Sequence, residues 1–437
     1  MRIVYNILFA IFFVLSLPYY FYRLWRRGNW RVGVGQRFGF YDAKLRDKLA
    51  GRKVIWFHAV SVGEVNLCAL LIAALGARLD GWTVLASTTT TTGMEELRRK
   101  LTPDVIKIYY PVDFPLCVNR TLKVIRPQVV TLVEAEIWPN LMWRLRDLDV
   151  PVLLANARLS DRSARRYGQC GFLFRSIFSN LAAVGVQNDG DAARLVSVGC
   201  RSENVKVTGN LKFDAIDLVT EHRIDPRRIL NWAGISDEAL VLLGSSTHAG
   251  EERLLAEIYQ RLRPTHSRLR LVVVPRHFER GAEVKRELTD LGLVCCLRSD
   301  YSLSDRADHS GKPESDCLIV DSTGELRFFF DVADVVFVGK SMLARGGQNP
   351  IEPAAAAKAV VFGPHMENFR IIAKNFVKTG SMIQVRDRKE LEQVLERLVN
   401  SEPERRSLGE AAQAEVNRNR GALERTVDLV SPFLDVK

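Results

Sequence analysis

Acidic residues follow two apolar runs in the first half of the sequence, where carboxylates can take part in proton transfer. Glu64 comes shortly after the run Val54–Ala59, and Glu134 and Glu136 closely follow the run Val129–Val133. Side chains alternate along an extended chain, so Glu134 and Glu136 are expected on the same side. Carboxylates at the carboxyl ends of parallel strands are placed to act as general bases. Spacing alone leaves alternatives open: Glu64 as a first-turn helix carboxylate, and the pair as solvated acids on a turn.

Basic and hydroxyl residues follow other apolar runs and predict contacts with an anion. Lys212 lies in the segment Gly209–Asp214, and Arg276 follows Pro275 at the end of a run. An arginine in such a place can bind a phosphate through two parallel hydrogen bonds. The segment Gly244–His248 supplies Ser and Thr, which suit an anion cradle or equally a capping turn. Lys212 can equally be an ordinary surface lysine.

A glycine-containing loop, Gly339–Ala356, joins an apolar run to an alanine-rich segment expected to be helical. Gly346 and Gly347 permit a tight turn, and Asn349 is expected to cap the helix. The order of strand, glycine loop and helix amino-terminus is typical of sites for phosphorylated ligands, because free N–H groups face the anion. An ordinary strand-to-helix turn is the alternative.

The elements that position these residues are predicted by apolar runs that alternate with helical periodicity. This order indicates an α/β fold in which a parallel sheet is covered on both faces, once in each half of the chain. Two doubly wound halves of this kind offer a cleft for a ligand. The expected strands are 54–59, 82–86, 105–109, 129–133, 152–155, 182–186 and 205–207, then 240–244, 269–274, 293–297, 318–320, 335–338, 360–362 and 382–385.

Domain boundaries follow from the same pass along the 437 residues. We expect an amino-terminal anchor over 1–22 and a first Rossmann-like domain over 23–220. A charged stretch predicts a linker over 221–235. A second Rossmann-like domain over 236–437 is expected to end in helices.

The amino-terminal stretch Ile3–Tyr22 is almost wholly apolar and has about the length that spans a hydrocarbon core. Basic residues follow it, and residues 1–53 hold eleven Lys and Arg against two acidic residues. This pattern predicts a membrane anchor, either single-pass with the later residues in the cytoplasm or monotopic. The net charge of +11 alone would also suit nucleic acid, but the apolar neighbour favours a membrane surface.

Several kinds of site are argued against. The seven Cys are scattered without a C-x-x-C pair, which indicates a reducing compartment rather than disulfides or structural zinc. No metal-ligating His spacing occurs, so neither a metal nor a cofactor is expected. The tripeptide Gly339-Lys340-Ser341 is similar to the end of a P-loop, but Asp334 stands where that motif needs glycine, which argues against an ATPase.

Together these segments resemble the Kdo transferases (3-deoxy-D-manno-octulosonic acid transferases) of Gram-negative lipopolysaccharide synthesis. The resemblance covers nearly the whole chain. It rests on the apolar amino-terminus and on His58–Glu64, Glu134–Asn140, Asn156–Ser160, Gly209–Asp214, Pro275–His277, Gly324–Leu326 and Gly346–Pro353, in this order.

The resemblance implies a GT-B glycosyltransferase, with two Rossmann-like domains facing a central cleft. It implies CMP-Kdo as donor and a lipid A precursor (lipid IVA) as acceptor, at the cytoplasmic face of the inner membrane. It implies that Glu64 is the general base, and that Glu134 and Lys212 stabilise the transition state of an inverting transfer. The implied CMP-binding residues are Pro275, Arg276, Gly324, Glu325, Leu326, Gly346, Gly347, Gln348, Asn349 and Glu352.

Two residues depart from the family's pattern. Gln348 stands where the family often has His, so a hydrogen bond to the nucleotide is expected there rather than a proton transfer. Lys340 replaces a small residue. Two other functions fit the same architecture: a GT-B transferase or epimerase that uses a UDP-sugar, and a membrane-anchored binding protein with an inactive cleft.

Overall fold

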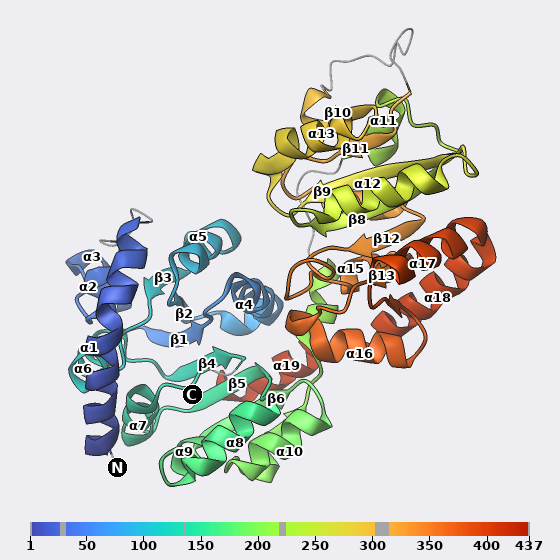
Figure 1. The fold of residues 1–437 in the computed structure, drawn as a ribbon. Coiled ribbons are helices and arrows are strands. Elements are labelled where there is room, and N and C mark those ends of the chain that lie inside the picture. Colours follow the sequence, from blue (N-terminus) through green and yellow to red (C-terminus); the bar gives the residue numbers. More distant parts are fainter. Residues whose placement is uncertain (1, 27–31, 135, 218–223, 302–313, 436–437) are drawn as a thin grey trace. The chain divides into compact units, whose positions relative to one another are not determined.

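The computed structural model describes residues 2–26, 32–134, 136–217, 224–301 and 314–435. They divide into two compact units. The first contains residues 1–217 and 419–437, and the second contains 218–418 (Figure 1). Each unit has a parallel sheet of its own with helices on both faces, which confirms the expected α/β class.

The sheet of the first unit is parallel throughout, in the order β3-β2-β1-β4-β5-β6-β7. Its two central strands are each buried over nearly their whole length, so each reads as a continuous apolar run. The strands are β1 (Lys53–His58), β2 (Trp82–Thr88), β3 (Ile106–Tyr109), β4 (Val129–Val133), β5 (Val152–Ala157), β6 (Leu181–Val186) and β7 (Val205–Val207).

The strand order of the first sheet reverses between β1 and β4, which pair directly with His58 opposite Leu132. From β1 the chain winds outward through β2 to β3, and from β4 it winds the other way. At such a point, the connections that follow the two central strands run in opposite directions. Ligands bind in the space outside the carboxyl ends of these strands. Glu64 and Glu134 follow these two strands.

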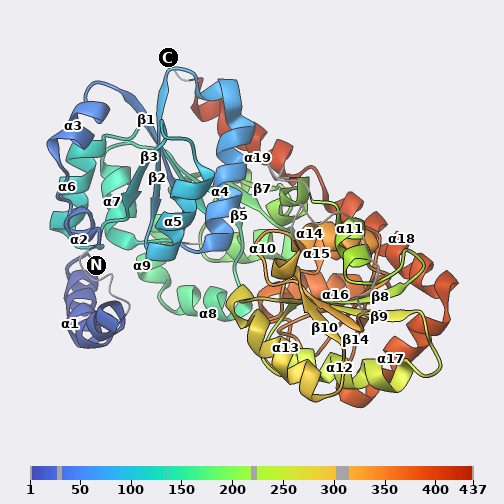
Figure 2. The same cartoon turned by 90° about the horizontal axis from the view of Figure 1, so that it is seen from above.

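Alternation along β1 divides the first unit into two cores. Ile55 and Phe57 face one group of helices, and Val54 and Trp56 face the other. On one side pack α4 (Val62–Leu75), α5 (Thr91–Lys100) and α19 (Ala422–Val430). On the other pack α3 (Ala43–Leu49), α6 (Pro115–Ile125), α7 (Pro139–Asp147), α9 (Gly171–Phe178) and α10 (Asp189–Ser197), with α4 and α6 seen on opposite sides of the strands in Figure 2. Two further helices of this unit are α2 (Val34–Arg37) and α8 (Asp161–Gln169).

The sheet of the second unit repeats this plan in the order β10-β11-β9-β8-β12-β13-β14, again with parallel pairs. Its reversal point lies between β8 and β12, where Ser245 is opposite Val338. The strands are β8 (Leu240–Thr247), β9 (Leu269–Pro275), β10 (Cys295–Leu297), β11 (Cys317–Ile319), β12 (Val335–Val338), β13 (Ala359–Phe362) and β14 (Ile383–Gln384). Each predicted strand therefore overlaps an observed one.

Helices also cover both faces of the second sheet. One core contains side chains of α12 (Glu251–Leu262), α13 (Gly281–Asp290) and α17 (Arg388–Asn400). The other contains α11 (Pro226–Trp232) and α14 (Leu326–Val332). The remaining helices are α15 (Ile351–Ala355), α16 (Arg370–Lys378) and α18 (Glu402–Asn419).

Two expected boundaries are corrected. The helices at the carboxyl end were assigned to the second domain, but α19 packs on the first sheet, where Val427 and Val430 join the core. Asp214 accepts hydrogen bonds from the N–H groups of Gly421 and Leu423 and thereby caps α19. The expected linker 221–235 is partly α11, whose Ile229 is buried in the second unit; residues 221–223 lie outside the described part of the chain.

The helix α1 (Arg2–Arg26) covers the expected anchor. Its window Arg2–Tyr19 is long and apolar enough to cross a membrane, with a mean hydropathy of 1.7. A window that begins at Val62 passes the same test, but it contains α4, whose apolar residues are largely in the first core. Length and composition alone therefore do not distinguish α1 from α4 as a membrane helix. The difference is burial, because none of the window in α1 is buried.

His58, at the end of β1, makes the fold sensitive to acid. It is fully buried, stacks on Tyr110 with ring centroids 3.8 Å apart, and burial lowers its pKa to about 3. The pKa of His58 is lower in the folded protein than in the unfolded chain. The stability that depends on a neutral His58 is therefore fully present above pH ~6.5 and is lost as pH falls toward 3. The contribution of His58 to the free energy of unfolding should drop by about 2 kcal/mol between pH 7 and 5, whereas Asp113, whose pKa burial raises to about 6, contributes with the opposite sign. His58→Gln should remove most of this drop in urea unfolding measured at the two pH values, and an equal drop in both proteins would contradict the assignment.

Candidate active site

Glu64 is held at the first turn of α4 by a reciprocal capping box. The Ser61 Oγ accepts a hydrogen bond from the Glu64 N–H, and the Glu64 carboxylate accepts from the Val60 N–H at 2.9 Å and from the Ser61 hydroxyl at 2.8 Å. This is the S-x-x-E pattern of helix starts. Glu64 therefore does stabilise the start of α4. The same hydrogen bonds fix the orientation of its carboxylate beside the end of β4.

The segment after β4 brings two more carboxylates to the same place. Glu134 adopts a positive φ of 63°, a strained conformation for a non-glycine residue, and its N–H donates to the carbonyl of Ala155. The Glu136 carboxylate accepts a hydrogen bond from the Trp138 indole at 3.1 Å. Ala135, between the two acids, lies outside the described residues. The strained turn thus directs two acids to the edge where Glu64 lies.

Lys212 reaches the same cluster from the loop after β7. Its Nζ lies 3.8 Å from the Glu134 Oε1, and both side chains are about a quarter exposed. The backbone around it is fixed by side chains: Asn156 accepts from the Leu211 N–H, and Asn210 accepts from the Lys212 N–H. The structure therefore brings Glu64, Glu134 and Lys212 together, as the sequence-based assignment requires.

Burial and neighbouring charges raise the proton affinity of Glu64. Burial raises its pKa, the hydrogen bonds from Val60 and Ser61 oppose this rise, and the negative charges of Glu134 and Glu136 add to it. Burial likewise raises the pKa of Glu136. A carboxylate with a raised pKa accepts a proton more readily at neutral pH than an ordinary glutamate does. Lys212 supplies a compensating positive charge at the edge of the cluster.

In the second unit, a buried carboxylate organises the loop after β12. Glu251, fully buried at the start of α12, accepts hydrogen bonds from the backbone N–H groups of Lys340, Ser341 and Met342 at 2.7 to 3.1 Å. It also accepts from the His248 N–H at 2.9 Å. Of these donors, the His248 N–H belongs to the segment 244–248, for which an anion cradle and a capping turn were the two alternatives; its bond to Glu251, at the start of α12, is that of a capping turn.

The glycines of this loop serve close packing. Gly339 lies so near β8 that a Cβ there would meet the Ser246 carbonyl oxygen at 2.4 Å. Gly347 has a φ of 70°, and a Cβ there would meet the Met366 Sδ at 2.4 Å. The N–H of Gly346 donates to Glu367, and the N–H groups of Gly347 and Gln348 donate to backbone carbonyls. Among these residues, side chains rather than free N–H groups are left to contact a ligand.

Asn349 and Glu352 form a connected pair at the start of α15. The N-cap position of α15 is Pro350 rather than the expected Asn349, but the Asn349 Oδ1 accepts a hydrogen bond from the Ile351 N–H, and its amide donates to the Glu352 Oε1 at 2.8 Å. Burial raises the pKa of the Glu352 carboxyl, while the positive charge of Arg327 lowers it. A carboxylate held this way suits hydroxyl donors better than a phosphate.

The other predicted CMP-binding residues lie after neighbouring strands. Pro275 is buried at the end of β9, and the Arg276 side chain is exposed, with its N–H bonded to the Thr247 carbonyl. Glu325 forms a bidentate pair with Arg298 at 2.9 Å. Its carboxylate is therefore already paired.

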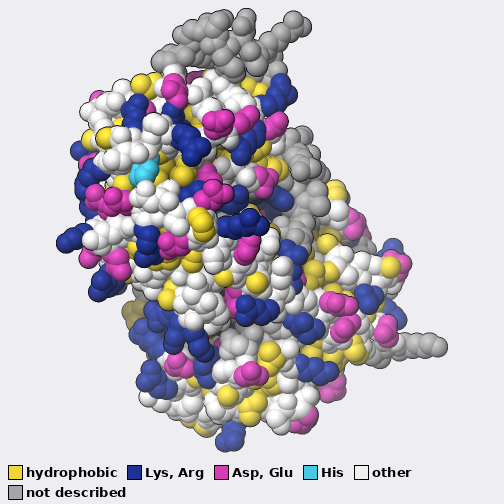
Figure 3. Space-filling view, turned by 90° about the vertical axis from the view of Figure 1, so that its right-hand side faces the viewer, with side chains coloured by type: hydrophobic (Ala, Val, Ile, Leu, Met, Phe, Trp, Pro, Cys, Tyr) yellow, Lys and Arg dark blue, Asp and Glu magenta, His cyan; other side chains and the backbone are white. Residues whose placement is uncertain are grey.

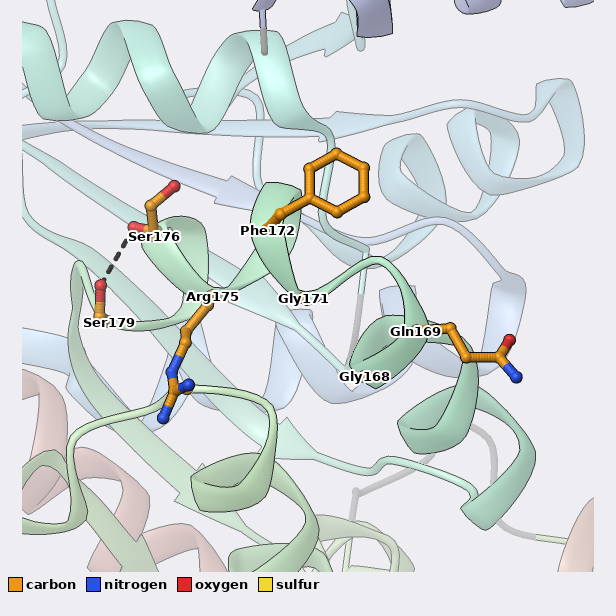
Figure 4. A pocket seen from close by; sticks show the side chains of 8 residues that line it. Gly168, Gln169, Gly171, Phe172, Arg175, Ser176 and Ser179 are labelled. Atoms are coloured by element: carbon orange, nitrogen blue, oxygen red, sulfur yellow. Dashed lines mark hydrogen bonds between the residues drawn. The ribbon is translucent and has the colours of Figure 1, made fainter.

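A separate hollow in the first unit lies against α8 and α9 (Figure 4). Its volume is about 730 Å³, and its lining includes Phe172, Arg175 and Ser176. Figure 4 shows Ser179 bonded to the Ser176 carbonyl at 3.2 Å, with Arg175 directed outward. The lining contains one cation and no carboxylate, so it offers no acid–base pair.

Comparison with known proteins decides the family. A family model described as 3-Deoxy-D-manno-octulosonic-acid transferase (kdotransferase) matches residues 33–215. A 3-deoxy-D-manno-octulosonic acid transferase of Bordetella pertussis is 34% identical over 426 residues, which cover 94% of this chain and 95% of that protein. The chain belongs to this family. A transferase of the same description from Haemophilus influenzae is 31% identical over 410 residues, covering 93% of this chain and 92% of the relative.

Solved structures support the fold of this Kdo transferase. The UDP-GlcNAc 2-epimerase of Neisseria meningitidis bound to UDP-GlcNAc has a TM-score of 0.57 at 16% identity, covering 86% of this chain and 99% of that one. An S. aureus protein, MnaA, in a co-structure with UDP, has a TM-score of 0.55 at 16% identity, covering 88% and 98%. Likeness at this identity concerns the fold, which is the expected GT-B architecture of two Rossmann-like units.

Sequence reasoning missed several supporting residues of the transferase. Glu251 was recognised only as the start of a helix, because its partners lie 89 to 91 residues away along the chain. Asn156 lies in a quoted motif but had no role assigned. Arg298 carried no signal at all. Asp214 belongs to the same segment as Lys212, 209–214. This proximity was the one indication that Asp214, which caps α19, fixes the loop that carries Lys212.

Glu251 should be essential to the stability of the second unit. Glu251→Ala would leave four backbone N–H groups without their acceptor, so we expect urea unfolding to show a loss of roughly 3–5 kcal/mol. Glu257→Ala on the same helix is the matched control. Glu257 pairs at the surface with Arg253 and Arg388, so its loss should cost about 1 kcal/mol or less. Equal losses in the two variants would show that the buried carboxylate does not organise the loop.

Proposed function

We propose that this Kdo transferase moves Kdo from CMP-Kdo to a sugar hydroxyl of a lipid A precursor (lipid IVA). The transfer inverts the anomeric configuration, releases CMP, and takes place at the cytoplasmic face of the inner membrane. The observation that carries the proposal is the cluster at the reversal point of the first sheet. There Glu64, with its raised pKa, lies near Glu134, Glu136 and Lys212, in a chain that belongs to the Kdo transferase family.

Glu64 acts as the general base. An acceptor hydroxyl is a poor nucleophile, and removal of its proton as it attacks lowers the barrier. The proton passes to the Glu64 carboxylate, and the acceptor oxygen forms a bond to the anomeric carbon of Kdo. The bond from that carbon to the CMP phosphate oxygen breaks, and its electron pair leaves with CMP. The Val60 N–H and the Ser61 hydroxyl hold Glu64 in one orientation throughout.

Lys212 and Glu134 stabilise the transition state as a pair. Positive charge develops at the sugar ring as the bond to CMP stretches, and a carboxylate such as Glu134 stabilises such charge. Lys212 contacts the carboxylate of Kdo, and the proximity of Lys212 to Glu134 supports this role. The strained φ of Glu134 indicates that the surrounding fold enforces this geometry.

The second unit binds the nucleotide. Arg276, exposed at the end of β9, supplies a charged hydrogen-bond donor for the phosphate. The paired Asn349 and Glu352 accept hydrogen bonds from the ribose hydroxyls. Lys340, at the end of β12, adds a second cation near the glycine loop. The remaining contacts are assigned to Pro275, Gly324, Glu325, Leu326, Gly346, Gly347 and Gln348.

The product of the reaction tests the proposal directly. Incubation of the full chain with CMP-Kdo and lipid IVA should increase the acceptor mass by one or more Kdo residues and release CMP in equal amount, measured by mass spectrometry. CMP should raise the melting temperature of the protein, whereas UDP should not. A shift with UDP and none with CMP would favour a UDP-sugar enzyme, and CMP binding without product would favour an inactive cleft.

The base assignment has its own test. Glu64→Gln keeps a side chain that can complete the capping box, so the fold should persist while the turnover rate falls by about 10²–10⁴-fold. In the unchanged enzyme, the rate should fall as pH is lowered through the raised pKa of Glu64, because the protonated carboxyl cannot accept a proton. The variant should lose this acidic limb.

A matched control is Asp189→Asn, which neutralises a first-turn carboxylate of α10 outside the cluster. This variant should keep both the rate and the acidic limb. If Glu64→Gln retained the rate of the unchanged enzyme while remaining folded, Glu64 would not be the base.

A further inference from the structure

The helix α1 has one face packed on the first unit and one apolar face with no protein cover among the described residues. Tyr5, Asn6, Phe9 and Phe13 are half-buried. The exposed side chains on the rest of the helix include Ile3, Val4, Ile7, Leu8, Ile11, Phe12, Val14, Leu15 and Leu17, at 49 to 76% exposure. On the face drawn in Figure 3, by contrast, apolar side chains are scattered among charged ones. The outward face of α1 over 3–17 carries no charge.

Polar contacts fix the first turns of α1 to the globular part of the first unit. The Arg2 guanidinium donates two hydrogen bonds to the Asp147 carboxylate, at 2.7 and 2.8 Å. The Tyr5 hydroxyl donates to Asp113 at 2.8 Å, and the Asn140 amide donates to the Asn6 side-chain oxygen at 2.7 Å. Asp113 also caps α7 by accepting from two of its first N–H groups. The start of α1 is thus part of a polar network.

Aromatic packing continues this contact along the helix. Tyr5 meets Trp143 edge-on at 5.5 Å, and Phe9 and Phe13 each lie 5.1 Å from Phe114 between ring centroids. Contacts therefore extend from residue 2 to residue 13, which is about 17 Å at 1.5 Å per residue. Figure 1 shows α1 running beside α6 and α7 over this length. More than half of the apolar segment lies alongside the unit.

These contacts are incompatible with a crossing of the bilayer. In a spanning helix, the first turn lies beyond a hydrocarbon core of about 30 Å, away from the domains that follow. Arg2 and Asn6 would then be separated from Asp147 and Asn140. Alternatively, the polar groups of the first unit would have to enter the hydrocarbon, which costs several kcal/mol for each unsatisfied backbone group. Neither arrangement preserves the observed network.

We propose that α1 lies flat in the surface of one leaflet, with its outward face among the acyl chains and its other face on the first unit. The occupant of the outward face is an anionic phospholipid surface. The sequence directly after the apolar segment contains Arg23, Arg26, Arg27 and Arg31, which complement anionic headgroups. The apolar surface also continues onto the start of α6, where Leu116 is 60% exposed next to the Phe114 on which α1 packs.

This placement brings lipid next to the carboxylate cluster. Phe9 contacts Trp138 with centroids 6.2 Å apart, and Trp138 donates to the Glu136 carboxylate. An acceptor with acyl chains therefore reaches the cluster with its chains still in the leaflet. This last consequence depends on the proposed function, whereas the orientation of α1 does not, so the two can fail separately.

The orientation can be tested by protease access. The full chain with an amino-terminal epitope tag is bound to sealed vesicles of phosphatidylethanolamine and phosphatidylglycerol, with the globular units outside. Protease added outside should remove the tag while the vesicles stay intact. A tag that survives until detergent is added would show that α1 crosses the bilayer and would overturn the proposal.

Paired substitutions test which face meets lipid. The double variant Leu8→Asp/Leu15→Asp changes outward side chains only and should lower the vesicle-bound fraction at least about tenfold without changing the melting temperature. Phe9→Ala changes the packed face, so it should lower the melting temperature and leave binding within about twofold. Equal binding by the double variant and the unchanged protein, or a stronger loss with Phe9→Ala, would overturn the assignment of the faces.

Discussion

The structure depends on one geometric constraint, the reversal of strand order within each parallel sheet. Consecutive parallel strands need crossovers of one hand, so a sheet that grows in both directions from its centre sends the connections from its two central strands apart. In the first unit this happens after β1 and β4, and in the second after β8 and β12. The segments that diverge there carry Glu64 and Glu134 in one unit, and Ser246 and Lys340 in the other. The positive φ values of Glu134, Ser246 and Lys340 show that the backbone is strained at these ends.

The two reversal points use charge in opposite ways. In the first unit, burial raises the pKa of Glu64, the charges of Glu134 and Glu136 add to this rise, and Lys212 lies 3.8 Å from the Glu134 carboxylate. In the second unit, the acidic side chain Glu251 points inward and neutralises the N–H groups of the loop. One edge thereby holds a carboxylate whose pKa is raised, and at the other edge the loop N–H groups are already bonded to a carboxylate of the protein.

Sequence patterns predicted the strands well, because a strand or helix is encoded by residues that lie close together in the sequence. Buried parallel strands are continuous apolar runs, and each expected run overlaps a strand. The carboxylates Glu64 and Glu134 could be placed near strand ends, because strand ends can be located from those runs; their catalytic roles stay a prediction. The errors concern long-range contacts that periodicity does not encode. The occupation of the loop N–H groups by Glu251, the pairing of Glu325 with Arg298 and the return of α19 to the first unit all join residues far apart in the sequence. The apolar segment of α1 was recognised, but its packed face is marked only by polar and aromatic residues whose partners lie more than one hundred residues away.

The return of α19 has a consequence for biosynthesis. Because residues 419–437 belong to the first unit, the whole second unit is an insertion within the first. The first core includes Val427 and Val430, and Asp214 must wait for the N–H groups of Gly421 and Leu423. A ribosome that synthesises the chain from its amino-terminus releases these residues only after the second unit has been made. The half that holds the carboxylate cluster therefore cannot complete its core until the second unit has been synthesised. Truncation near the carboxyl end would damage the first unit rather than the second, although the second lies next to the cut in the sequence.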